Sequence, residues 1–240
     1  SVNVKLPSPR ASTFHDRLTS SEPTPASGNP KGDENKIRNA ESLNVLGKLG
    51  VSESNVYFLG QELRIRDGGL PDFLDRAYVG VSQLINNIGV PAVLYVPAWE
   101  GGHQDHDAAH LVGVVIAERY RLVDKIYQFP MYRASEKGIP FFKLFSPLAQ
   151  NGNVFRDSYP WRYRFRFIIA FLSYKSQLKT IIGLFPFFIY YQLIIGHQML
   201  QAASSDRVYE KPHLGMLLYE KRKAYCWSEF LIVTNEFLSR

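Results

Sequence analysis

The stretch from residue 92 to residue 121 restricts the fold more than any other part of the sequence. Ala92–Val96 is a continuous run of apolar and β-prone residues, and Asp107–Arg121 reads as a helix. A strand that lacks polar alternation and is flanked by helices is typical of a parallel sheet covered on both faces. The sequence therefore predicts α/β architecture built around this strand.

The elements predicted on either side extend this pattern. Strands are expected at 2–6, 56–59, 126–129 and 214–219, and helices at 39–49, 73–87, 225–238 and through most of 165–200. Loops are expected at 7–36 and 61–70, and loops with short elements at 134–160. Together these elements predict one domain over residues 1–240. Its Rossmann-like, mostly parallel sheet has helices on both faces, and residues 134–240 form a less regular, largely helical C-terminal part.

Bulk composition excludes several classes of protein. The formal charge is +6, but the basic residues are spread along the chain, so we expect no nucleic-acid partner. Cys226 is the only cysteine, which excludes an intrachain disulfide and a CxxC metal knuckle and favours a reducing compartment. Residues 1–30 lack the apolar core of a signal peptide. We therefore expect a cytoplasmic protein, and the sequence does not fix its oligomeric state.

An aromatic, basic region in the second half leaves two interpretations open. Thr180–Gly196 is strongly apolar but just short of a membrane-spanning helix, and it is interrupted by Pro186 and Gln192. The first interpretation is a buried or surface-docked helix pair, with the aromatic residues in the core. The second is peripheral contact with a membrane. The residues that motivate the second are Tyr159, Trp161, Tyr163 and Phe165, with Arg162, Arg164 and Arg166 between them.

The polar segment Glu100–Asp107 lies between the central strand and its helix. Ligands of open α/β sheets bind at the carboxyl ends of the strands, so this position favours a functional site. His103 and His106 are suitable zinc ligands, and Asp105 could orient a histidine. The competing interpretation is that Asp105 or Asp107 only caps the helix.

This segment, Glu-Gly-Gly-His-Gln-Asp-His-Asp, closely resembles the second signature of the PIG-L/LmbE-like N-deacetylase family. Gln104 replaces the usual proline. Weaker similarities follow the family's order along the chain and extend the resemblance over most of residues 1–180. They are Arg38-Asn39-Ala40-Glu41, Leu46-Gly47, Leu49-Gly50-Val51, Phe58-Leu59-Gly60 and Lys175-Ser176-Gln177.

The resemblance implies a zinc-dependent hydrolase that removes an acetyl group from an N-acetylglucosamine-type glycoconjugate. It assigns His106 as a zinc ligand and His103 as the group that polarises the amide or protonates the leaving amine. It assigns Asp105 as the carboxylate that holds a histidine. Arg38 and Glu100 are assigned to substrate binding.

The family's first signature, His-Pro-Asp-Asp-Glu, has no counterpart in this sequence. In the family it supplies a zinc-ligating histidine and aspartate and the general base. Because strand 2–6 resembles the family's second strand, we expect the signature upstream of Ser1. His15-Asp16 and Asp33-Glu34 are the candidates for ligands within the chain. The alternative is a carbohydrate-binding or interaction protein without catalytic activity.

Overall fold

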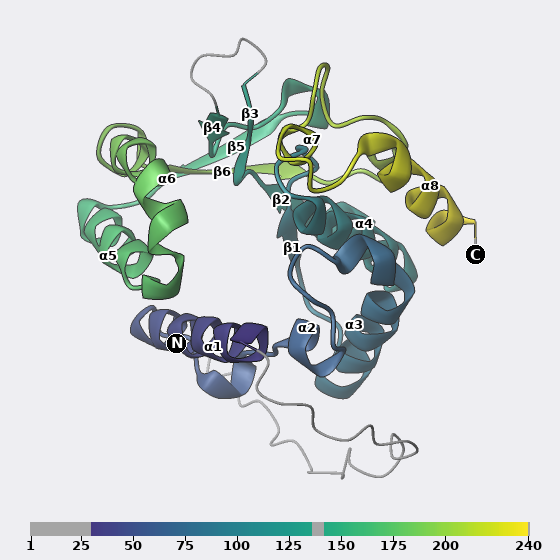
Figure 1. The fold of residues 1–240 in the computed structure, drawn as a ribbon, viewed down its shortest axis with the longest axis horizontal. Helices are drawn as coiled ribbons and strands as arrows, with labels where there is room; N and C mark the ends of the chain where they lie inside the picture. Colours follow the sequence, from purple (N-terminus) through teal and green to yellow (C-terminus); the bar gives the residue numbers. More distant parts are fainter. Residues whose placement is uncertain (1–29, 136–141, 240) are drawn as a thin grey trace.

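A computed structural model describes residues 30–135 and 142–239, and Figure 1 shows the arrangement of its elements. The helices are α1 Pro30–Lys48, α2 Leu59–Glu62, α3 Leu74–Ile88, α4 Gln104–Arg119, α5 Trp161–Leu172, α6 Leu178–Tyr190, α7 Leu218–Lys221 and α8 Trp227–Leu238. The strands are β1 Leu94–Pro97, β2 Ile126–Phe129, β3 Tyr132–Ala134, β4 Phe142–Leu144, β5 Val154–Ser158 and β6 His197–Ala202. Short 3₁₀ turns and one π-helical turn, Tyr191–Ile195, connect them.

Four strands form one sheet in the order β1-β2-β6-β5, and β3 and β4 form a separate antiparallel pair. β1 and β2 are parallel, whereas β6 is antiparallel to both β2 and β5. The predicted α/β class is confirmed, with a mixed sheet in the described residues. The single domain over 1–240 stays a prediction.

The predicted elements nearest the central strand are confirmed. The strand expected at 92–96 is observed as β1, and the strand at 126–129 is β2 with the expected limits. The helices predicted at 73–87 and 107–121 are α3 and α4, and α4 begins three residues earlier than expected. The helix predicted at 225–238 is α8, and the helix at 39–49 is the second half of α1.

Three other predictions are wrong. Residues 56–59 do not form a strand, because a helical turn begins at Leu59 and the Leu63 amide donates to the Leu59 carbonyl over 2.8 Å. Four apolar residues in a row do not distinguish a strand from a helical turn. Residues 214–219 do not form a strand either, since α7 begins at Leu218. The loop predicted for 7–36 ends early, because α1 begins at Pro30.

The segment 165–200 is helical only as far as residue 195. Gly196 has φ +58° and ends the π-helical turn, and β6 begins at His197. Gln201 lies fully buried in β6, and its amide donates to the carbonyls of Leu148 (2.8 Å) and Gly152 (2.7 Å). The two hydrogen bonds of Nε2 offset part of the cost of burying this polar side chain, and a strand with glutamine at a buried position lacks the apolar pattern that would have identified it. The strand predicted at 2–6 lies outside the described residues.

The main core forms where α4 packs on β1. A Cβ at Gly113 would lie 2.4 Å from Cγ1 of Val96, so the glycine lets the helix approach the strand closely. On the opposite face of the sheet Tyr95, Tyr127 and Phe155 form a row with ring centroids 6.0 Å apart. This packing fixes the strand end from which the polar segment leaves.

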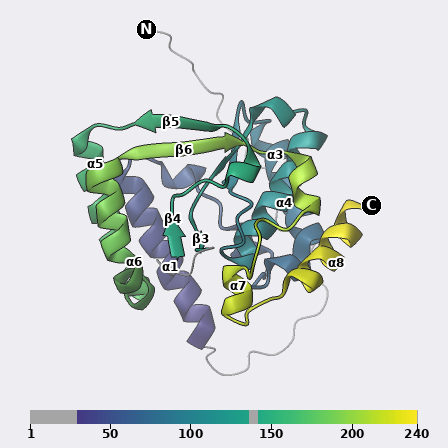
Figure 2. The same ribbon diagram turned by 90° about the horizontal axis from the view of Figure 1, so that it is seen from above.

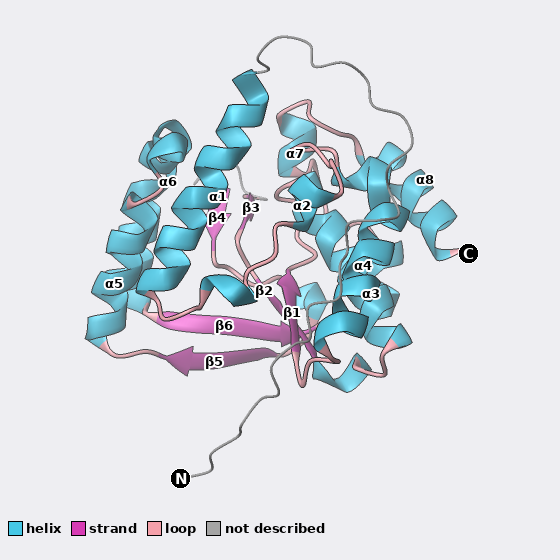
Figure 3. Cartoon of the chain, turned by 90° about the horizontal axis from the view of Figure 1, so that it is seen from below, coloured by secondary structure: helices cyan, strands magenta, loops and turns pink. Residues whose placement is uncertain are grey.

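The longer helices form two groups, one at each side of the sheet. α3, α4 and α8 gather on one side, and α1, α5 and α6 on the other (Figures 1 and 2). Figure 3 shows the same separation from below, with β5 running toward α5 and the antiparallel β6 running back from it toward β1. Within residues 30–135 and 142–239, every helix is too short or too polar to cross a bilayer.

Candidate functional site

The site lies in the loop that joins the carboxyl end of β1 to the start of α4. The Ala98 amide donates to the Phe129 carbonyl over 2.9 Å, so the parallel pairing of β1 and β2 continues into the loop. α4 begins at Gln104, and His103 is its N-cap. The polar segment therefore lies at the carboxyl edge of two parallel strands, where ligands of such sheets bind.

Both glycines of the loop are required by its geometry. Gly101 has φ +70°, a conformation that side chains other than glycine rarely adopt. A Cβ at Gly102 would lie 1.8 Å from the carbonyl oxygen of Tyr132. The Gly101 carbonyl accepts a 2.8 Å hydrogen bond from the Leu218 amide, so α7 packs directly against this loop.

Asp107 holds the loop from the first turn of α4. Its Oδ1 accepts hydrogen bonds from the amides of Glu100 (3.3 Å) and Gly101 (3.2 Å), and the side chain is fully buried. Burial, aided by the nearby Glu100 charge, raises the pKa of Asp107 well above its ordinary value. The helix cap is different from the one expected, because Nδ1 of His103 accepts the Asp105 amide over 3.1 Å.

Glu100 connects the loop to the chain that follows β2. Its Oε1 accepts hydrogen bonds from the amides of Met131 (2.8 Å) and Tyr132 (2.9 Å). The residue is 2% exposed, and burial raises the pKa of its carboxyl group to about 7. The structure thus places Glu100 behind the loop, where its carboxylate positions backbone at the site.

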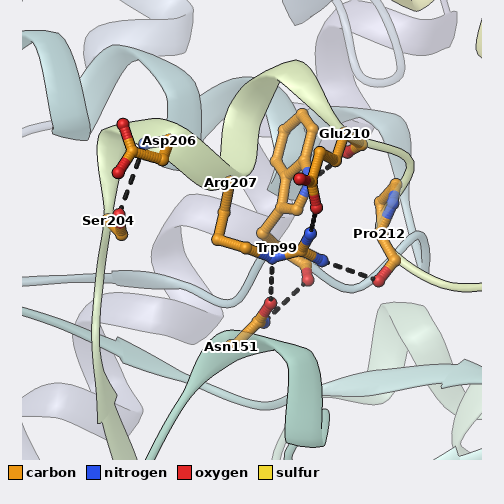
Figure 4. A network of polar contacts seen from close by, with 7 residues as sticks. All are labelled: Trp99, Asn151, Ser204, Asp206, Arg207, Glu210 and Pro212. Carbon is orange, nitrogen blue, oxygen red and sulfur yellow. Dashed lines mark hydrogen bonds and ion pairs between the residues drawn. The ribbon is translucent and has the colours of Figure 1, made fainter.

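A polar network holds Trp99, the residue before Glu100, in place (Figure 4). The indole of Trp99 donates to the Glu210 carbonyl over 2.9 Å, and the Asn151 amide donates to the Trp99 carbonyl, also over 2.9 Å. Arg207 donates to Oδ1 of Asn151 (3.3 Å) and to the Pro212 carbonyl (3.1 Å), and it forms an ion pair with Glu210. These contacts fix both the side chain and the backbone of Trp99, where the loop begins.

The two histidines lie side by side at the start of α4. Their ring centroids are 5.2 Å apart, and the ring of Tyr132 packs edge-on against His106 at 5.4 Å. Nδ1 of His106 is buried and has no hydrogen-bond partner in the described residues. Burial, with a contribution from His103, lowers the pKa of His106 to about 4, so the imidazole is neutral at neutral pH.

Asp105 contacts a different element from the one expected. Its two carboxylate oxygens accept the amides of Gly68 (2.6 Å) and Leu70 (3.0 Å). Burial raises its pKa, and these two hydrogen bonds and the nearby His103 oppose the rise. The side chain thus holds the 68–70 loop, and its effect on His103 is electrostatic.

Arg38 reaches the same region from α1. Its Nη1 lies 2.8 Å from Oδ2 of Asp67, and both residues line a cavity of about 560 Å³ together with Asp105. The charge of Asp67 also acts on His106, whose pKa it raises against the larger effect of burial. The structure therefore places Arg38, Asp67 and Asp105 on the cavity, and the Asp67 charge acts on His106, which does not line the cavity itself.

A family model described as GlcNAc-PI de-N-acetylase, PIG-L, matches residues 17–117. Over this segment the chain is similar to the PIG-L family. The match contains all five residues assigned to the site from sequence. Comparison with curated proteins and with solved structures finds no match.

Two segments that resemble the PIG-L family meet in the structure although they are far apart in sequence. Glu41, from the Arg-x-x-Glu motif of α1, accepts hydrogen bonds from the amide (2.9 Å) and the hydroxyl (2.6 Å) of Ser176. Ser176 belongs to the Lys-Ser-Gln motif, which lies beyond the matched residues. The contact joins the two motifs in the folded chain.

Sequence reasoning missed two residues that shape this candidate site. Tyr132 supplies the carbonyl beside Gly102 and the ring beside His106, and Arg222 lies 5.8 Å above the Tyr132 ring. A signal for Tyr132 existed, because it follows β2 and parallel neighbours end at the same sheet edge. Nothing in the sequence around Arg222 indicated its position.

The described residues provide one candidate ligand for the zinc site that the resemblance implies. His106 presents a neutral imidazole with an unpartnered buried nitrogen, as a zinc ligand requires. Within residues 30–135 and 142–239, however, His, Cys, Asp and Glu side chains nowhere gather in a group of three that could hold a metal ion. Completing the site takes further ligands.

Proposed function

We propose that this chain supplies part of the catalytic centre of a zinc-dependent hydrolase. Its substrate is an N-acetylglucosamine-type glycoconjugate from which it removes the acetyl group. One observation carries the proposal: the unpartnered nitrogen of His106 lies beside His103 at the carboxyl end of β1. The family match over residues 17–117 supports the reaction type.

His106 is suited to hold the metal. A neutral imidazole binds zinc without first losing a proton, and burial keeps this ring neutral. Zinc in such a site polarises an acyl oxygen and lowers the pKa of bound water. The 68–70 loop, held by Asp105, and the ring of Tyr132 restrict the space around the imidazole.

His103 is suited to carry a proton. Because its Nδ1 accepts the Asp105 amide, the neutral ring carries its proton on Nε2. A ring fixed in this way can donate from Nε2 to the acyl oxygen, and when protonated it can supply a proton to the departing amine. The helix N-cap thereby sets both the tautomer and the orientation of the ring.

The remaining metal ligands would come from a strand beside β1. In the described residues β1 pairs only with β2, and the 560 Å³ cavity runs along all four β1 residues. A parallel strand placed there would end at the same edge as β1, close to His106. We infer that the His-Pro-Asp-Asp-Glu signature of the family would occupy this position.

Arg38 and Glu100 would serve the substrate in different ways. Arg38 lies on the cavity and retains donors beyond the one that contacts Asp67, so it can bind substrate oxygens directly. Glu100 is buried and would act through the amides of Met131 and Tyr132 that it holds.

The proposal is tested by metal analysis of the purified protein. Elemental analysis should find about one zinc per chain in the wild type and much less in His106→Ala. His197→Ala, a histidine substitution in β6, is the matched control and should keep the metal. Equal zinc in the wild type and His106→Ala would reject the assignment.

Turnover separates the roles of the two histidines. With an N-acetylglucosamine conjugate as substrate, His103→Gln should keep its zinc and lose about 10²–10⁴-fold in acetate release. Unchanged turnover would exclude His103 from proton transfer. The non-catalytic alternative would be favoured by a wild type that binds the sugar conjugate but does not bind zinc and does not release acetate.

A further inference from the structure

α5 and α6 pack against each other through aromatic rings. The rings of Phe171 and Phe188 are stacked with centroids 4.1 Å apart, and Tyr159 meets Phe167 edge-on at 5.3 Å. The Tyr159 hydroxyl donates to Gln192 over 2.6 Å. These contacts cover one face of each helix. Both helices lie at the outer side of the molecule (Figures 1 and 2).

The other face of each helix carries large apolar side chains in contact with solvent. We call this surface the outer face of α5–α6. Its members recur every three to five residues, the spacing of a helix stripe, and each is between 40% and 70% exposed. They are Trp161, Phe165, Ile169 and Leu172 in α5, and Ile182, Phe187, Tyr190 and Ile194 in α6 and the turn that follows it.

The segment that carries the outer face has charges of one sign only. From Ser158 to Ser205 the sequence contains no Asp or Glu but five basic residues. Arg162 and Arg166 are exposed, and each follows an exposed aromatic residue of the α5 stripe. Basic residues in this arrangement attract an anionic surface.

Arg164 has a different role and does not belong to the outer face. It donates to the carbonyls of Gln192 (3.4 Å) and Leu193 (3.2 Å), and its guanidinium lies 4.4 Å from the ring of Trp161. This residue orients Trp161 and closes the end of the π-helical turn. Arg162 and Arg166 are thus the arginines of α5 available to a partner.

We propose that the outer face of α5–α6 docks in the plane of an anionic phospholipid membrane. The apolar stripe would enter the boundary between headgroups and acyl chains, with Trp161 at the headgroup level. Arg162 and Arg166 would bind lipid phosphates. The docking is parallel to the surface, because neither helix can cross a bilayer. This proposal does not depend on the metal site.

Flotation with vesicles tests the proposal on the full chain. The protein should float with vesicles of equal parts phosphatidylcholine and phosphatidylserine and stay behind with phosphatidylcholine alone. The double variant Arg162→Gln/Arg166→Gln should lose at least about tenfold in binding, since each basic residue near such a surface contributes a severalfold gain. Arg121→Gln/Lys125→Gln removes the same charge beyond the end of α4 and should bind as the wild type does.

A second pair of variants tests the apolar stripe. Phe165→Ser/Ile169→Ser should abolish flotation, whereas Ile232→Ser, which removes an exposed apolar residue of α8, should not. Circular dichroism and thermal unfolding establish that each variant is folded. Trp161 emission should also shift to shorter wavelength on adding the anionic vesicles, and Trp161→Phe should remove that shift.

Three results would overturn the proposal. One is a wild type that floats with neither vesicle, and another is an arginine double variant that floats as well as the wild type. The third is a concentration-dependent dimer that Phe165→Ser/Ile169→Ser dissociates while vesicle binding is unchanged. This last result would assign the outer face to a second copy of the chain.

Discussion

Replacing Glu100 by glutamine is expected to stabilise the protein at neutral and alkaline pH. The carboxylate is almost fully buried, and its Oε1 accepts two backbone amides, from Met131 and Tyr132. Glutamine keeps a carbonyl oxygen for those amides and removes the charge. The substitution therefore isolates the cost of burying an ionised group at this position.

The pKa of Glu100 gives the size and the sign of the effect. Burial raises it from 4.5 to about 7 in the folded protein. Between these values the unfolded chain releases the proton and the folded chain keeps it, so the free energy of unfolding falls as pH rises. At about 1.4 kcal/mol for each pKa unit, the loss approaches roughly 3 kcal/mol near pH 7 and stays constant above it.

The assay is urea unfolding of the wild type and Glu100→Gln between pH 4 and pH 9 in the presence of a chelator. The difference in unfolding free energy should grow through the window from 4.5 to about 7 and then level off. Glu62→Gln, at an exposed position of α2, should show no such dependence. A difference that does not vary with pH, or one that favours the wild type above pH 7, would refute the reasoning.

Three further substitutions test other parts of the structure. Gly102→Ala should cost about 1–3 kcal/mol in urea unfolding because its Cβ would overlap a backbone carbonyl, while Gly47→Ala, which meets open space, should cost nothing. Asp105→Ala should speed proteolytic cleavage at the 68–70 loop, whose two amides it leaves unpaired; an unchanged cleavage rate would show that other contacts hold that loop. Phe188→Ala, which removes a stacked and buried ring, should cost about 3–5 kcal/mol, and a smaller loss would mean that α5 and α6 are joined mainly by polar contacts.

The parts of the fold that the sequence predicted well are those where one physical requirement dominates. β1 and β2 are short, mainly apolar runs, which favour burial in a sheet. The helical patterns of α3 and α4 are long enough to be unambiguous. The motif that resembles the family's lies between β1 and α4, so the position of the polar segment at the sheet edge was also predictable.

The parts that were not predictable depend on contacts between distant residues. β6 is stable in the sheet because Gln201 finds carbonyl partners some fifty residues away, which no local pattern reveals. Likewise, Asp105 reaches amides that precede it by more than thirty residues. A sequence motif identifies the residue types of a site, but such long-range hydrogen bonds decide what each residue does.

Hydrogen bonds give the carboxylates and the histidines of the polar segment different roles. Each of its three carboxylates that hold backbone, Glu100, Asp105 and Asp107, accepts two amide N–H groups, and burial raises the pKa of all three. Oε1 of Glu100 and Oδ1 of Asp107 each accept two backbone amides, whereas Asp105 uses both of its oxygens to hold the 68–70 loop. The two neighbouring imidazoles are held differently, because Nδ1 of His103 accepts a backbone amide, whereas Nδ1 of His106 is buried and has no hydrogen-bond partner among the described residues.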